Sequence, residues 1–109
     1  MFSKLKLTDN ARMAQLEVRD YMEDMGYSCK LEVRVDNRGD GKTGRIDIVC
    51  YKDSEIIAIE VDRKTERRKS IIKLNNFHAT QKYVICRNNY LKGALKWNHN
   101  QQLDLNNLL

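Results

Sequence analysis

Apolar and polar positions alternate along the chain in two different rhythms, which separate helices from strands. Apolar residues recur at helical spacing over residues 8–25, so we predict a helix that Thr8 caps and Gly26 ends. Residues 28–36 instead alternate strictly, which is typical of a half-exposed strand. The helix stripe contains Ala14, Val18, Tyr21, Met22 and Met25, and the strand residues expected to face one way are Cys29, Leu31, Val33 and Val35.

Two strongly apolar segments follow a glycine-rich turn at residues 37–44. They span residues 45–51 and 56–62, and the polar turn between them is short enough only for an antiparallel hairpin. With an even-length loop, Asp47 lies directly opposite Glu60. An odd-length loop would shift this register by one residue.

The remaining pattern predicts a second helix and a further strand. Residues 66–79 form the helix, which Thr65 caps, and residues 81–87 form the strand, which a crossover of this kind places parallel to its predecessor. The residues that cluster on one face of this helix are Ser70, Ile71, Leu74, Phe77 and His78. The resulting order, αβββαβ, predicts an α/β (α+β) fold with a mixed four-stranded sheet flanked by helices.

Length and composition fit one globular domain. The chain has 109 residues, of which 41% are hydrophobic and 32% charged. We place the core at about residues 8–87. The tail, residues 88–109, is expected to form one more helix and an apolar end that packs on the core or on a second subunit. No apolar run is long enough to span a bilayer, so we expect no membrane contact.

Three widely spaced cysteines, Cys29, Cys50 and Cys86, each lie in an apolar run. They form no CxxC pair and no disulfide framework. We therefore expect three buried thiols in a protein of the reducing cytoplasm.

Positive charge is concentrated in one segment. The chain carries 20 Lys and Arg against 15 Asp and Glu, and residues 63–69 hold five cations in seven positions. Such a patch attracts phosphate through counterion release, although a solvated turn would have the same composition. The candidate nucleic-acid contacts are Arg45, Arg63, Lys64, Arg67, Arg68 and Lys69.

Asp47 and Glu60 are the candidate centre of chemistry. Side chains directly opposite each other in a sheet have Cβ atoms about 5 Å apart. Two carboxylates at that distance among apolar neighbours repel each other and are poorly solvated. A divalent cation, Mg²⁺ or Mn²⁺, would offset this cost. The alternative is that both side chains point to solvent from an open sheet face.

These segments resemble the motifs of the PD-(D/E)XK nuclease superfamily. The matching residues are Gly44-Arg45-Ile46-Asp47-Ile48-Val49 and, after a gap, Ile59-Glu60-Val61-Asp62. The resemblance covers about residues 8–87 and implies the same αβββαβ core. It also implies Mg²⁺-dependent hydrolysis of phosphodiester bonds, with Asp47 and Glu60 as metal ligands and the Val61 carbonyl as a further one.

The resemblance also leaves other roles to be filled. Family members commonly use an acidic residue on the first helix, for which Glu17 is the candidate. The motif lysine, which positions or activates the attacking water, is replaced here by Asp62. Three interpretations are open. Asp62 is an additional metal ligand, since it shares the face of Glu60; or the lysine has moved to Lys64 or Lys73, with Lys73 preferred; or there is no catalytic lysine and the enzyme is inactive.

Three functions are open at this point. The first is an endonuclease that cuts duplex or branched DNA, as a homodimer and with weak sequence preference, in a phage, a mobile element or a repair system. The second is an inactive nuclease-fold module that binds nucleic acid or protein. The third is a structural protein in which Arg45 and Arg63 pair with the carboxylates, with Arg45 opposite Asp62. The sequence does not distinguish DNA from RNA.

Overall fold

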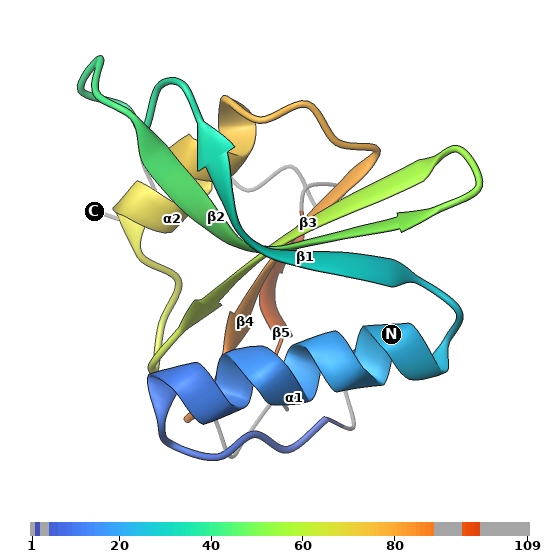
Figure 1. Cartoon of the computed structure of the whole chain (residues 1–109). Helices are drawn as coiled ribbons and strands as arrows, with labels where there is room; N and C mark the ends of the chain where they lie inside the picture. The colour runs from blue at the N-terminus through green and yellow to red at the C-terminus, as the bar shows by residue number, and fades with distance from the viewer. Residues whose placement is uncertain (1, 3–4, 89–94, 99–109) are drawn as a thin grey trace.

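The predicted order of helices and strands is confirmed by a computed structural model, which describes residues 2, 5–88 and 95–98 (Figure 1). The elements are α1 (Ala11–Asp24), β1 (Ser28–Val35), β2 (Gly44–Lys52), β3 (Glu55–Asp62), α2 (Arg68–Asn75), β4 (Gln81–Cys86) and β5 (Leu95–Asn98). The strands form one sheet in the order β1-β2-β3-β4-β5. β3 and β4 are parallel, and the other neighbouring pairs are antiparallel.

The predicted four strands are therefore present, and β5 adds a fifth at the edge beside β4. We expected a helix in the tail, which is wrong for residues 95–98 because their backbone pairs with β4. The rest of the tail, including its proposed role in a dimer, lies outside the described residues.

The two helices cover opposite faces of the strongly twisted sheet (Figure 1). On one face, the α1 side chains of Val18 and Met22 pack on Ile48 and Ile59. On the other face, Ile71 and Leu74 of α2 pack on strand residues such as Val49, Ala58 and Val84. The sheet is thus buried on both sides, which explains why its central strands are almost continuously apolar.

Both helices begin later than the sequence predicted. Asn10, not Thr8, caps α1, because its side chain accepts a hydrogen bond from the Met13 amide. Thr65 does not cap α2, which begins after Arg67 and has no capping side chain at that position. His78 lies beyond the end of α2 and is exposed, so its predicted place on the helix face is wrong.

The apolar side chains of β1 pack on the α1 side of the sheet before Glu32 and on the α2 side after it. Exposed and partly buried residues alternate along it as predicted, but Leu31 packs on the α1 side and Val33 on the α2 side. Glu32 has φ +54°, and this left-handed residue inside a strand accompanies the switch. The expectation that all four apolar residues of β1 share one face is therefore wrong.

The predicted register of the β2–β3 hairpin is confirmed. Lys52 pairs with Glu55, and the ladder continues to Ile48 and Ile59. Asp53 takes φ +54° in the two-residue turn. Continuing this register by one position brings Asp47 and Glu60 together.

In the described part of the chain, no helix is long and apolar enough to cross a membrane.

Cys50 and Cys86 are buried as expected, whereas Cys29 is only partly buried.

Candidate active site

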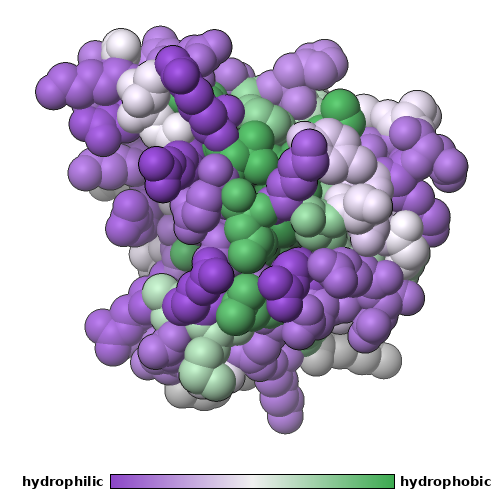
Figure 2. Space-filling view, viewed as in Figure 1, coloured by the Kyte–Doolittle hydropathy of each residue, from purple (hydrophilic) through white to green (hydrophobic). Residues whose placement is uncertain are grey.

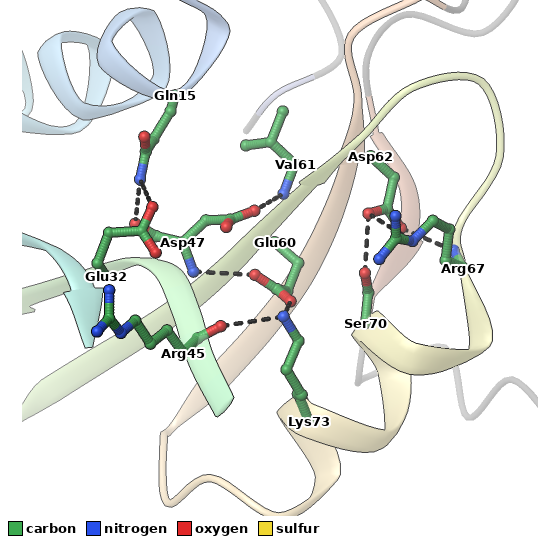
Figure 3. Close-up of polar contacts among 10 residues, drawn as sticks. All are labelled: Gln15, Glu32, Arg45, Asp47, Glu60, Val61, Asp62, Arg67, Ser70 and Lys73. Carbon is green, nitrogen blue, oxygen red and sulfur yellow. Dashed lines mark hydrogen bonds and ion pairs between the residues drawn. The ribbon is translucent and has the colours of Figure 1, made fainter. Parts of the chain in front are cut away.

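Asp47 and Glu60 meet where the regular β2–β3 ladder stops (Figure 3). The Asp47 amide donates a hydrogen bond of 2.9 Å to Glu60 Oε2, and the Val61 amide donates one of 2.8 Å to Asp47 Oδ2. Each carboxylate thus binds a backbone N–H of the opposite strand. The strands therefore separate at this point without leaving these two amide groups unsatisfied.

Burial makes both carboxylates unusually basic. Glu60 is 1% exposed, and this burial, with the nearby Asp47 carboxylate, raises the pKa of Glu60 to about 8. Desolvation likewise raises the pKa of Asp47, although the hydrogen bond from Val61 opposes the shift. A perturbed pair of this kind is a frequent mark of a functional site.

Lys73 supplies a cation to this pair. From α2 its ammonium forms an ion pair with Glu60 Oε1 and donates a hydrogen bond of 3.0 Å to the Arg45 carbonyl oxygen (Figure 3). Gly44 leaves room for it, because a Cβ at that position would lie 3.3 Å from Lys73 Cδ and 2.9 Å from Arg38 Cβ. The structure thus brings together Asp47, Glu60 and Lys73.

Asp62 has a different partner from those predicted. Its carboxylate accepts hydrogen bonds from the Arg67 amide (2.7 Å) and the Ser70 hydroxyl (2.8 Å). Asp62 therefore anchors the start of α2, and we withdraw both its role as a metal ligand and its proposed pairing with Arg45. By fixing α2, it also fixes the helix that carries Lys73.

The first helix contributes a residue that the sequence analysis missed. The Gln15 side-chain amide donates hydrogen bonds to Glu32 Oε1 (3.0 Å) and to the Asp47 carbonyl oxygen (2.8 Å). Glu32 thus stands beside Asp47 and contributes to the rise of the Asp47 pKa. The β1–β2 register places Glu32 opposite Asp47. The strict alternation of this strand instead predicted that Glu32 faces solvent, so it was not selected as a site residue.

Glu17 and Lys64 are not brought to the pair. Glu17 Oε1 instead accepts a hydrogen bond from the Thr8 amide, 3.0 Å away, before α1 begins. Lys64 is exposed in the connection between β3 and α2. Of the two candidate lysines, only Lys73 contacts a carboxylate of the pair.

A cleft of about 560 Å³ opens beside Asp47, between α2 and the β1–β2 hairpin. Its cationic lining comes from both walls and consists of Arg38, Arg45, Arg67, Lys69 and Lys73. Figure 2 shows hydrophilic side chains gathered over this part of the molecule, where the hairpin tip and α2 approach each other. A cleft with these charges is suited to an anionic chain.

Only some of the cations predicted to contact nucleic acid lie at this cleft. Arg45, Arg67 and Lys69 line the cleft, and Arg38 joins them although the sequence analysis did not select it. Arg63 instead pairs with Asp9, with 3.9 Å between Arg63 Nε and Asp9 Oδ1. Arg68 and Lys64 are exposed and do not line the cleft.

The donor chemistry at Asp47 and Glu60 fits a magnesium ion. Across the described ranges, no group of three His, Cys, Asp or Glu side chains is arranged to hold a metal. Mg²⁺, however, is commonly held by one or two carboxylates and keeps water and phosphate as its other ligands. Asp47 and Glu60 supply two such carboxylates; Asp47 lines the cleft, and the oxygens of buried Glu60 face the Asp47 amide and the Lys73 ammonium.

Comparison with known proteins supports the fold and leaves the function open. One solved structure, titled "Crystal Structure of Protein of Unknown Function AF1548", has a TM-score of 0.58 at 20% sequence identity. The match covers 77% of this chain and 50% of that one, so the chain spans about half the length of its neighbour. Neither protein-family models nor curated proteins gave a match.

Proposed function

We propose that the protein is a Mg²⁺-dependent endodeoxyribonuclease of the PD-(D/E)XK type. The observation that carries this proposal is the contact between the Lys73 ammonium and buried Glu60, next to Asp47. It supplies the cation whose usual motif position is occupied by Asp62. Lys73 is partly buried and reaches the Glu60 carboxylate from another element, as a displaced motif lysine would.

The three residues would divide the work. Asp47 and Glu60 would hold the metal, which lowers the pKa of a bound water and offsets charge on the scissile phosphate. Lys73 would orient the attacking water and stabilise the negative charge that develops on phosphorus-bound oxygens. Gln15 and Glu32 would keep Asp47 in position. The Val61 carbonyl remains a candidate ligand.

The substrate would lie in the cationic cleft. Arg45 on one wall and Arg67 and Lys69 on the other can contact successive phosphates of a strand, whereas Arg38 is paired with Asp40. Contacts of this kind carry no base information, so we propose selection by DNA structure or by weak sequence preference.

The test is incubation of the purified protein with labelled duplex, single strand, flap, four-way junction and RNA. Each substrate is treated with Mg²⁺, Mn²⁺ or EDTA, and Asp47→Ala and Glu60→Ala are assayed in parallel. We expect metal-dependent cutting of at least one DNA substrate that both variants lose. Binding without cutting, unchanged by EDTA, would replace the nuclease with the nucleic-acid-binding module.

A further inference from the structure

Cys29 and Cys50 form a pair of thiols across β1 and β2. They are direct partners in the ladder, and their Sγ atoms lie 2.8 Å apart. Direct partners in antiparallel strands have Cα atoms about 4.5–5.5 Å apart, which is within the range that a disulfide spans. The backbone therefore needs no rearrangement for a bond between them.

The two thiols differ in access. Cys50 is fully buried, whereas Cys29 is partly buried at the edge of the cluster under α1. A small reagent can therefore reach Cys29 first, and Cys50 is positioned to attack it next. Burial raises the pKa of both thiols, so the reaction is slow at neutral pH and accelerates as the pH rises.

We propose that Cys29 and Cys50 are a disulfide-forming modification site that locks the edge strand β1 to β2. Among the strands that the structure describes, β1 is at the edge of the sheet, and its one neighbour is β2. A covalent link between them restricts the unfolded chain and resists separation of β1. This role is independent of nuclease activity.

The step balances with a low-molecular-weight disulfide, such as oxidised glutathione, as the oxidant. The Cys29 thiolate attacks one glutathione sulfur and releases the first reduced glutathione. The Cys50 thiolate then attacks Cys29 Sγ and releases the second. Two protein thiols are oxidised, one glutathione disulfide is reduced, and the two protein protons end on the released glutathiones.

The test treats the folded protein with oxidised glutathione at pH 8, traps free thiols after denaturation, and maps the peptides. We expect one intramolecular Cys29–Cys50 bond in the wild type and in Cys86→Ala, and no such bond in Cys29→Ser or Cys50→Ser. The oxidised wild type should unfold about 5 °C or more above the reduced protein, and dithiothreitol should reverse the shift.

The wild-type peptide map decides the outcome without any variant. Three free thiols after treatment, a glutathione adduct that persists on Cys29, or a bond that includes Cys86 would each overturn the proposal. An unchanged melting temperature after complete oxidation would overturn the claim that the bond locks β1 in place.

Discussion

The two ends of the β2–β3 hairpin are built in different ways. At the turn end, from Lys52 and Glu55 to Ile48 and Ile59, the strands pair by regular backbone hydrogen bonds. At the open end, the carboxylates of Asp47 and Glu60 accept the amides of the opposite strand. The open end therefore exchanges regular pairing for one buried acid, Glu60, and one partly buried acid, Asp47, a cost that is expected where a site carries function.

The strongest contrast lies between two lysines that both donate to a backbone carbonyl. Lys73 at the open end binds the Arg45 carbonyl and Glu60, whereas Lys52 at the turn end binds the Met25 carbonyl at 3.0 Å. We expect Lys73→Met to lower the single-turnover cleavage rate about 10²–10⁴-fold, because it removes a group that acts on the reacting atoms. Lys52→Met and Lys64→Met should cleave like the wild type. Equal losses in all three variants would contradict the assignment of Lys73.

A smaller loss of cleavage rate is expected when Gln15, which binds the Asp47 carbonyl oxygen, is replaced. Gln15→Ala removes the hydrogen bonds to Glu32 and to the Asp47 carbonyl oxygen. Partners of metal ligands typically contribute about 10–100-fold, so cleavage should fall by that factor and be partly recovered at high Mg²⁺ concentration. Gln81→Ala is the matched control, since its side chain binds Tyr83 near the turn end. A loss that Mg²⁺ does not relieve would indicate a structural role alone.

The link between Asp62 and α2 can be tested through stability. Asp62→Ala leaves the buried Ser70 hydroxyl and the Arg67 amide without their acceptor, which should cost about 1–3 kcal/mol in the free energy of unfolding. Urea denaturation measures this, with Asp20→Ala as the control, because the Asp20–Arg19 ion pair is exposed. An Asp62 variant as stable as the control would show that the carboxylate does not anchor α2.

The buried acids also predict how stability depends on pH. The pKa of Glu60 rises from its ordinary value of 4.5 to about 8 on folding, so the folded state holds a proton that the unfolded state releases. Without metal, stability should fall as the pH rises between these values, by at most about 1.4 kcal/mol per pH unit. Glu60→Gln should flatten this slope, whereas Glu55→Gln near the turn end, whose amide oxygen can still accept the hydrogen bond from Tyr27, should retain it. A stability that increases over this range in metal-free buffer would contradict the raised pKa.

The turn end shows how far the sequence alone could lead. The apolar runs of β2 and β3 and the short turn between them determined the register, and that register placed Asp47 beside Glu60. The predicted helix starts were wrong. Asn10 caps α1 through a local hydrogen bond from the Met13 amide, whereas the start of α2 is bound by Asp62 from β3.

The side-chain contacts at the open end could not be predicted from local sequence patterns. Lys73 was selected from its place on the helix, but its contact with Glu60 depends on how α2 packs over Gly44. Glu32 was not predicted, because its left-handed backbone changes the face of β1 without changing its alternation. Gln15 was not predicted, because its partners lie on β1 and β2. Asp62 was assigned to the metal because the motif lies in the same strand, whereas its partners come from α2.

Calorimetric titration with Mg²⁺ and Mn²⁺ at pH 7, in buffers of different ionisation enthalpy, tests most directly whether the buried acids are a metal site. Burial and the neighbouring Asp47 raise the pKa of Glu60, and a bound metal ion would lower it again, so metal binding should release protons. We predict binding with proton release by the wild type and by Glu55→Gln, loss of binding in Asp47→Asn, and weakened binding without this release in Glu60→Gln. The same affinity and proton release in all four proteins, or no binding by the wild type, would contradict the assignment of Asp47 and Glu60 as metal ligands.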